Sequence, residues 1–363
     1  MSAFFAVLYP LSFLIVLSLV VIVHEFGHFW AARLCGVKVE EFSLGFGRVL
    51  WSRQDKKETV LKVCAIPLGG YVRMFGDADA SSAKTDEKVK EFTEEEKKIS
   101  FPFQPLWKKS FISVAGPAMN YIFAIVLLTI FLSIYGIIVV PPVVSAVSEG
   151  SAAQAAGIQK DDRILTINGE KINEFSDVRR FVQLDSTLEM TVLRDGKEVS
   201  LTAYLKPETG GALLGVQALM TQEHFRSVSV PQAFVESLKE VWKITSDTLV
   251  VLKRILLGQR SPEDMRGPLG IAEASGDAAR GGAISFILFI IQVSIGIGLV
   301  NILPIPVLDG GHLLFYAIEA VIRRPINEKI QNMALNIGLG VLFCLLIVTS
   351  WNDIVRIFVR LFH

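Results

Sequence analysis

Two histidines and a glutamate stand at the end of the first apolar run of the chain. His24 and His28 are four residues apart and flank Glu25 in the pattern His-Glu-x-x-His. Positions i and i+4 of a helix share one face, so both imidazoles can bind one Zn²⁺ ion. Glu25 is then adjacent to the metal and can take a proton from its water. A group of interfacial polar residues at a helix end is the alternative, but such residues are costly in an apolar segment without a function.

A hydrolytic zinc site has three protein ligands and one open position, so a third ligand must come from elsewhere. The segment NILPIPVLDGGH at 301–312 offers Asp309 at the end of another uncharged run. Pro304 and Pro306 prevent a regular helix there, and broken backbone at membrane depth is tolerated only when it is buried in protein or lines a polar cavity. We predict Asp309 as the third ligand, with His312, one turn further into polar surroundings, as its competitor.

Several other residues could contact a substrate. Asn301 lies two turns before Asp309, and its amide could hold the substrate backbone or an oxyanion, or could serve only in packing. Asn120 places an amide inside a second apolar run, where helix packing and site lining are both open. Glycines 69 and 70 mark bends or a close backbone approach. The predicted substrate-binding residues are Asn301, Gly69, Gly70, Asn120 and Pro304.

The distribution of apolar residues predicts a polytopic membrane protein. Apolar residues make up 51% of the 363 residues, and the mean hydropathy is +0.47. A run of about 20 apolar residues can cross a hydrocarbon core. We predict four spanning helices, at about 4–28, 110–136, 284–308 and 333–357. A cleaved signal peptide is an unattractive interpretation of the first run, because no Lys or Arg precedes Arg33 and cleavage would discard the His-Glu-x-x-His motif.

Basic residues near the ends of these runs predict the orientation of the chain. Segments 29–109 and 309–332 are expected in the cytoplasm, and segment 137–283 on the far side. The formal net charge is zero, which indicates no nucleic-acid partner. The cysteines have no metal-ligand spacing and none falls in the far-side segment, so no disulfide framework is expected.

The segments between the predicted spans differ in character. Residues 38–75 are rich in β-branched and aromatic residues and predict β-hairpins beside the membrane, whereas the charged stretch 76–100 predicts a mobile loop. Residues 140–206 predict a compact module with short strands and a helix from Ser176 to Gln183. Residues 231–257 predict an amphipathic helix that lies on the membrane or packs against the module.

We therefore divide the chain into four parts. Residues 1–136 and 284–363 are the two membrane parts of one catalytic domain. Residues 137–210 form the inserted α+β module, and residues 211–283 form a linker that contains the amphipathic helix.

These elements suggest a mechanism of peptide hydrolysis. Zinc polarises the scissile carbonyl and lowers the pKa of its water, while Glu25 takes the water proton and returns it to the leaving amine. The backbone of an intact helix is hydrogen-bonded and shielded, so a membrane-spanning substrate must be locally extended. An edge of the 38–75 hairpins could pair with it by strand addition.

With these residues in place, the chain resembles the site-2 protease family of zinc metalloproteases, of the bacterial regulator-of-sigma-E type. The resemblance covers nearly the whole length. It rests on HEFGH at 24–28, the hairpin segments SLGFG and PLGGYV, GPAMN at 116–120 and NILPIPVLDGG at 301–311. The module, with GSAAQAAGIQKDDRILTINGE, resembles a single PDZ domain, whereas the best-known members of the family have two.

The resemblance implies one zinc ion per chain, bound by His24, His28 and Asp309, with Glu25 as the catalytic base. It implies a bacterial inner membrane location, a periplasmic PDZ domain and an active site near the cytoplasmic side. The implied substrates are single-span membrane proteins already trimmed by another protease, such as anti-sigma factors and remnant signal peptides. Membrane lipid is then the other expected partner.

Three other functions fit parts of this pattern. Intramembrane His and Asp side chains could line the path of a zinc transporter, but transport needs no glutamate beside the first histidine. An inactive homologue could bind hydrophobic segments through its PDZ-like region, although nothing would then require Glu25. A membrane-anchored protease could act on soluble proteins, and the placement of the motif at membrane depth argues against that.

Overall fold

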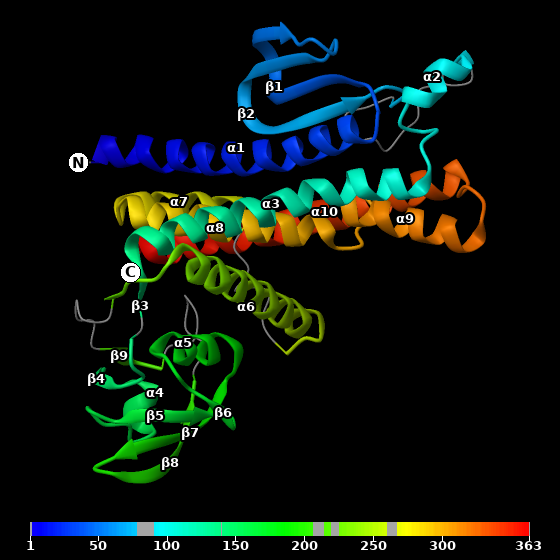
Figure 1. Ribbon diagram of the computed structural model, residues 1–363. Helices are drawn as coiled ribbons and strands as arrows, with labels where there is room; N and C mark the ends of the chain where they lie inside the picture. Colours follow the sequence, from blue (N-terminus) through cyan, green and yellow to red (C-terminus); the bar gives the residue numbers. More distant parts are fainter. Residues whose placement is uncertain are drawn as a thin grey trace. The chain divides into compact units, whose positions relative to one another are not determined.

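The computed structural model describes residues 2–77, 91–138, 140–205, 214–218, 225–259 and 267–362. The chain forms two compact units (Figure 1). The first comprises residues 1–127 and 266–363, and the second comprises residues 128–265. The two stretches of the first unit are far apart in sequence, so its fold brings together the early and late parts of the chain.

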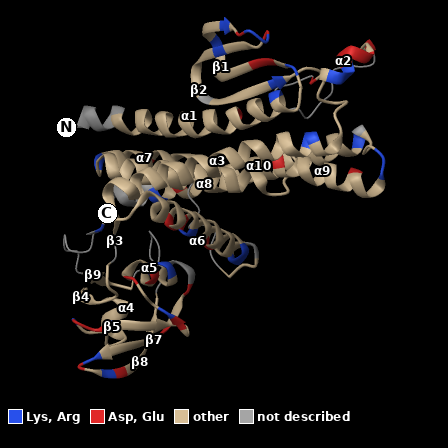
Figure 2. Ribbon diagram, viewed as in Figure 1, with Lys and Arg blue, Asp and Glu red and all other residues tan. Residues whose placement is uncertain are grey.

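Four helices of the described chain are long and apolar enough to span a membrane, as predicted. Their spanning segments are Leu8–Leu34 in α1 (Ser2–Leu34), Leu106–Tyr135 in α3 (Leu106–Tyr135), Ala283–Ile302 in α8 (Ala283–Ile302) and Lys329–Arg356 in α10 (Glu328–Phe362). Figure 2 shows these ribbons almost free of charged residues. The third span was predicted to reach residue 308, but it ends at Ile302, because Pro304 and Pro306 interrupt the helical backbone. A shorter helix, α9 (Asp309–Ile322), follows this break.

The helices of the first unit pack around apolar contacts and close backbone approaches. Val16 and Val20 of α1 are buried with Ile290 of α8. A Cβ atom at Gly27 would lie 2.2 Å from the carbonyl oxygen of Ala115, so α1 and α3 touch through their backbones. This contact aligns the two helices where α1 carries its histidines.

Helix α7 (Pro268–Arg280) occupies a segment that the sequence predicted as an irregular link. Pro268 stands at its first turn, where a missing N–H is tolerated. The helix packs on α1, with a Tyr9 hydroxyl to Asp277 carboxylate hydrogen bond of 2.7 Å and buried Ser12 and Ser275 hydroxyls 3.2 Å apart. Small residues within the predicted linker of residues 211–283 therefore permit close helix packing, as at Gly276, where an added Cβ atom would lie 2.3 Å from the Tyr9 ring.

Strands β1 (Val39–Gln54) and β2 (Val60–Met74) form an antiparallel, irregular sheet that follows α1. One end of the sheet lies at the end of the helix, where the Thr59 hydroxyl donates to the carbonyl of Val39. The other end lies further back along α1, where the Ser18 hydroxyl donates to the carbonyl of Pro67 at 2.7 Å. Residues 18 and 34 of a helix are separated by about 24 Å, so the sheet extends along much of the first span.

The predicted loop at 76–100 is described only in part. Residues 78–90 lie outside the described residues, whereas Glu94–Ile99 form helix α2. Thr93 caps this helix in a capping box with Glu96, which explains why a short, charged segment is helical.

The second unit is an α+β module with its own core. Its four-stranded antiparallel sheet has the order β6–β5–β7–β8 (Glu170–Lys171, Arg163–Ile167, Thr187–Arg194 and Lys197–Tyr204). Two further pairs join β4 (Val144–Val147) to β9 (Val216–Ala218) and β3 (Ile137–Ile138) to β10 (Phe225–Arg226). The two short helices are α4 (Ala152–Ala155) and α5 (Phe175–Leu184), and the apolar face of α5 is buried through Val178 and Phe181. The helix that the sequence placed at 176–183 corresponds to α5.

Helix α6 (Val230–Leu256) packs against α5 through ion pairs. Arg180 pairs with Asp247 at 2.7 Å, Lys243 with Asp177 at 3.2 Å and Arg254 with Asp185 at 2.8 Å. Of the two arrangements expected for this amphipathic helix, packing against the module is therefore present. Its apolar residues Phe234, Leu238 and Trp242 are exposed.

A buried ion pair ties the sheet of the module to the turn before it. The fully buried carboxylate of Asp162 accepts two hydrogen bonds from Arg194, at 2.8 and 2.7 Å, and one from the backbone N–H of Gln159. Burial alone would raise the pKa of Asp162, but these hydrogen bonds outweigh it and hold the pKa below its usual range.

Replacing Asp162 with asparagine is expected to destabilise the module by about 2–4 kcal/mol, because Arg194 loses its buried partner. The native ion pair contributes fully above about pH 4, and its contribution is lost as the pH falls through the lowered folded-state pKa. Hydrogen exchange at the backbone amides of Ile164 and Val192 in the full chain measures both effects. The exposed Lys160→Gln change is the control, and equal protection in the two variants would contradict the prediction.

Candidate metal centre

Helix α1 presents three polar side chains within an otherwise apolar segment. His24, Glu25 and His28 fall on adjacent turns near its end, and the side chain of His24 is buried. The imidazole planes of the two histidines are nearly perpendicular, with ring centroids 4.9 Å apart. Their Nε2 atoms lie 3.3 Å apart and therefore point to one place.

The break between α8 and α9 brings Asp309 to the same place. Asp309 is the first residue of α9, and Leu308 before it is extended. The chain turns tightly here, because a Cβ atom on Gly310 would lie 2.2 Å from the carbonyl oxygen of Leu303. A Cβ atom on Gly311 would lie 2.3 Å from the carbonyl oxygen of Ile305. Larger residues at either glycine would push the carboxylate of Asp309 away from the histidines.

The three side chains form a group that could hold a metal ion. The Nε2 atom of His24 lies 3.1 Å from one carboxylate oxygen of Asp309, and that of His28 lies 3.3 Å from the other. A tetrahedral zinc ion with bonds of about 2.0–2.1 Å has ligand atoms about 3.3 Å apart. The spacing and the two-imidazole, one-carboxylate chemistry therefore fit zinc with one position left open. Among the described residues, these three are the group of His, Cys, Asp and Glu side chains close enough to share an ion.

A second hydrogen bond fixes the orientation of each histidine. The Nδ1 atom of His28 lies 2.8 Å from the carbonyl oxygen of Ile112, to which it donates, so Nε2 is free to bind a metal. The Nδ1 atom of His24 lies 3.4 Å from the side-chain nitrogen of Asn120. The side-chain oxygen of this buried asparagine has no partner among the described residues. When Nε2 of His24 binds a metal, Nδ1 carries the proton, so we assign the amide with its oxygen toward His24, where it accepts that proton.

Replacing Asn120 with alanine is expected to weaken zinc binding about 10–100-fold, because His24 loses the group that orients its ring. Competition with a chromophoric chelator gives the zinc dissociation constant. Asn332→Ala, an exposed asparagine on α10, is the matched control. An unchanged dissociation constant in Asn120→Ala would show that this amide does not support the ligand.

A cavity of about 190 Å³ opens over the ligands, and Glu25 lies on its wall. Strand β2 passes close to this residue, since a Cβ atom on Gly70 would lie 3.2 Å from the Cγ atom of Glu25. The remaining walls come from β2, the segment between α2 and α3, α3 itself and the α8–α9 region: Val72, Met74, Phe101, Ile112, Ser113, Asn301, Val307, Leu308, His312 and Tyr316. Glu25 is therefore next to the open metal position without being one of the three ligands.

The predicted substrate-binding residues lie at different places. Asn301 lines the cavity. Gly70 lies beside Glu25 but is not among the lining residues, and Gly69 has a positive φ of 108° against the ring of Phe46. Asn120 lies behind His24 rather than among the lining residues, and Pro304 is exposed in the chain break. His312, the competing ligand, lines the cavity but lies outside the group of three.

Two residues that lie at the candidate metal site were not identified from the sequence. Tyr316 lies two turns after Asp309 on α9 and reaches the cavity. Gly116 of α3 faces the histidines, because its added Cβ atom would lie 2.3 Å from His28 Nε2 and 2.9 Å from His24 Cε1. The motif GPAMN marked the region, but only the packing of α3 on α1 shows what the glycine faces.

Comparison with known proteins also indicates a zinc-dependent protease. A family model for peptidase family M50 matches residues 12–345. A Mesorhizobium japonicum protein named as a zinc metalloprotease is 39% identical over 356 residues, which cover 94% of this chain and 97% of the relative. Metalloprotease MmpA of Caulobacter vibrioides is 36% identical over 377 residues, with 95% of each chain covered.

The site and these relatives together define a zinc metalloprotease with candidate membrane-spanning helices. The chain belongs to peptidase family M50, and it is a metalloprotease of the site-2 type. A match at 29% identity to a Vibrio cholerae protein, over 457 residues and 98% of that relative, extends the similarity to a longer chain.

Proposed function

We propose that this protein is an intramembrane endopeptidase that cuts the spanning segments of single-span membrane proteins. The observation that carries the proposal is the depth of the ligand set. His28 lies six residues before the end of the Leu8–Leu34 span, which corresponds to about 9 Å along a helix. A metal at this depth can reach a peptide bond that lies within a bilayer.

The same site residues support the chemistry. Bound zinc supplies Lewis-acid polarisation of the scissile carbonyl and of the attacking water. Glu25 takes the proton of that water and returns it to the leaving amine. The amide of Asn301, which lines the same cavity, would hold the substrate backbone or its developing oxyanion. We propose His24, His28 and Asp309 as the ligands of one zinc ion per chain.

Strand β2 supports the binding of an extended substrate. Its backbone passes close to Glu25 at Gly70, where an added Cβ atom would lie 2.7 Å from the carbonyl oxygen of Ser43 and 3.2 Å from the Cγ atom of Glu25, so the absence of a side chain permits this approach. A substrate added to a sheet edge here regains in strand pairing the backbone hydrogen bonds it loses when its helix unwinds. Gly69 and Pro304 contribute by shaping the backbone on the two sides of this path.

We further propose that the α+β module of residues 140–206 is a periplasmic PDZ domain that restricts entry by size. The substrates are then membrane proteins already trimmed by another protease, such as anti-sigma factors and remnant signal peptides. In this arrangement the protein lies in a bacterial inner membrane with its metal site near the cytoplasmic side. The basic residues that flank the spans, among them Arg33, Lys108 and Lys109, support that orientation.

Cleavage of a defined substrate in liposomes tests the proposal. The purified full chain, loaded with zinc, is reconstituted with a tagged single-span protein that carries either a short tail or a folded domain on the far side. We expect a cut inside the span, located by mass spectrometry, for the short-tailed substrate only. A helix-breaking residue in the span should accelerate the cut, because it lowers the free energy needed to extend the substrate.

Two results would contradict parts of this proposed function. Cuts confined to the loops outside the span, or equal hydrolysis of a soluble unfolded protein, would indicate a membrane-anchored protease of soluble substrates. Equal cleavage of the short-tailed and folded-domain substrates would leave the intramembrane reaction intact but would exclude the filtering role of the module.

A further inference from the structure

A second cavity, of about 220 Å³, lies at the end of α1 away from the metal ligands. It is enclosed by the last turn of α1, the segment that leads into β1 and the turn between β1 and β2. Its lining residues are Arg33, Gly36, Val37, Lys38, Val39, Lys57 and Thr59. Three of these are cationic and none carries a carboxylate, so the wall of the cavity is suited to an anion.

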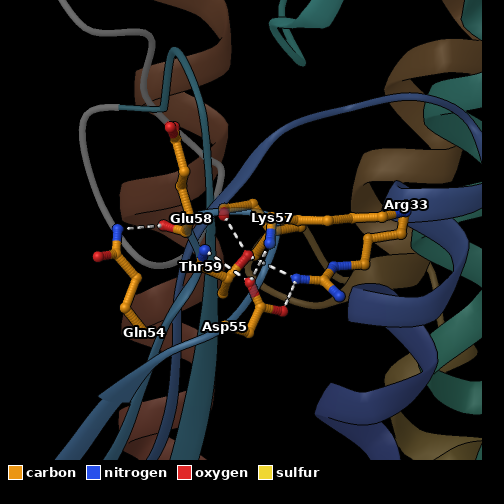
Figure 3. Close-up of polar contacts among 7 residues, drawn as sticks. Arg33, Gln54, Asp55, Lys57, Glu58 and Thr59 are labelled. Atoms are coloured by element: carbon orange, nitrogen blue, oxygen red, sulfur yellow. Dashed lines mark hydrogen bonds and ion pairs between the residues drawn. The ribbon is translucent and has the colours of Figure 1, made fainter.

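The cations of this wall are held in place by the hairpin turn. Figure 3 shows Arg33 of α1 together with the turn residues Asp55, Lys57 and Thr59. The Arg33 guanidinium pairs with the Asp55 carboxylate and donates to the Thr59 hydroxyl at 2.8 Å. Backbone N–H groups of Lys57 and Thr59 donate to the other oxygen of Asp55, at 2.8 and 3.0 Å. The turn is therefore a built structure, in which Arg33 has little freedom to move.

The balance of charge leaves one cation in excess. Asp55 neutralises Arg33, and Glu58 pairs with Lys38 at 2.7 Å. Among the described residues, Lys57 has no carboxylate within ion-pair distance. Its ammonium group therefore remains available to a ligand in the cavity, beside two other cations that can share an oxyanion.

Neighbouring residues place this cavity at the level where a membrane span meets water. Trp30 and Trp107 have exposed side chains, at 47% and 65%. Tryptophan is enriched at membrane interfaces, where its ring lies among the lipid headgroups. The ammonium group of Lys108 donates to the carbonyl of Cys35 at 2.8 Å, so the start of the α3 span lies level with the end of the α1 span.

We propose that this cavity binds the phosphate group of an anionic phospholipid. Basic pockets at the ends of membrane spans bind phosphate-bearing headgroups, and each cation near the surface contributes about a fivefold gain in affinity. A water molecule takes up about 30 Å³ of liquid, so the cavity has room for a phosphate with several waters. The buried Val37 and Val39 form its apolar floor.

The site joins the two elements that flank the metal centre. On one side Arg33 belongs to α1, the helix of His24 and His28. On the other side Lys57 and Thr59 lead into β2, which continues to Gly70 beside Glu25. A phosphate bound between them therefore holds the sheet against the helix and stabilises the position of β2 over the cavity of the active site.

Titration of the full chain in detergent tests the proposal. The probes are a short-chain phosphatidylglycerol, a short-chain phosphatidylcholine and inorganic phosphate, and native mass spectrometry measures the bound fraction. Lys57→Gln should weaken phosphatidylglycerol binding about fivefold. Lys56→Gln, which removes the same charge from the neighbouring residue outside the cavity, should change it by less than about twofold. Bound phosphatidylglycerol should also slow hydrogen exchange in the Asp55–Thr59 turn.

The other outcomes overturn the assignment. Equal losses in Lys57→Gln and Lys56→Gln would mean a general attraction of the lipid to a charged turn. Binding of phosphatidylcholine as tight as that of phosphatidylglycerol would mean that lipid charge is not recognised. Inorganic phosphate that displaces the lipid at comparable concentration would make a soluble phosphate compound, rather than a phospholipid, the occupant.

Discussion

Replacing Glu25 with glutamine is expected to lower the rate of peptide-bond hydrolysis by about 10²–10⁴-fold while the chain keeps its zinc. Glutamine has nearly the shape of glutamate, so it fits the same place beside Gly70 on the wall of the cavity. It cannot accept a proton from the attacking water. The three ligands are untouched, and their distances to one another do not depend on residue 25.

The measurement combines single-turnover cleavage with metal analysis of the same sample. Glu95→Gln, at an exposed glutamate in the first turn of α2, is the matched control and should keep full activity. Activity of Glu25→Gln within about tenfold of the native protein would show that another group serves as base. Loss of zinc in Glu25→Gln would instead show that Glu25 takes part in metal binding.

Replacing Gly116 with alanine is expected to raise the zinc dissociation constant by at least about 100-fold and to abolish activity. The added methyl group would lie 2.3 Å from the Nε2 atom of His28 and 2.9 Å from the Cε1 atom of His24. Either the rings must rotate away from the metal position or α3 must move from α1. Movement of α3 is opposed by the backbone contact between Gly27 and Ala115.

Gly296→Ala is the control for this change. Gly296 also lies within an apolar helix, α8, but a Cβ atom there would have no neighbour within 4 Å. Equilibrium dialysis gives the bound zinc, and the thermal unfolding of the metal-free proteins shows whether packing is preserved. A Gly116→Ala protein that holds zinc as tightly as Gly296→Ala would mean that the histidines bind their ion from another direction.

The sequence predicted the parts of the site that follow from local spacing. His24 and His28 share a helix face because of helical periodicity, and the apolar run that contains them predicts the depth of the site. Asp309 could be chosen because the prolines before it exclude a regular helix. These arguments need no knowledge of how one element packs on another.

The remaining features depend on tertiary packing and could not be predicted in this way. Gly116 acquires its role only through the rotation of α3 about its own axis, and Tyr316 through the direction of α9. The bends in the pairing of β1 with β2 set which residue lies beside Glu25, and a shift of one residue in one direction would replace Gly70 by Tyr71. Helix α7 was not predicted, because glycine and proline in a sequence argue against a helix. In the structure, the close packing of α7 on α1 favours small residues, and only the tertiary contact reveals this.

The proposed ligands of the metal are far apart in sequence, since His24 and His28 are on α1 and Asp309 is the first residue of α9. A ribosome must therefore translate the whole stretch from His28 to Asp309 before the third ligand exists. Until then the nascent chain has membrane helices and the histidine pair but an incomplete coordination sphere. The order of synthesis thus leaves the proposed metal site incomplete until α9 has been made.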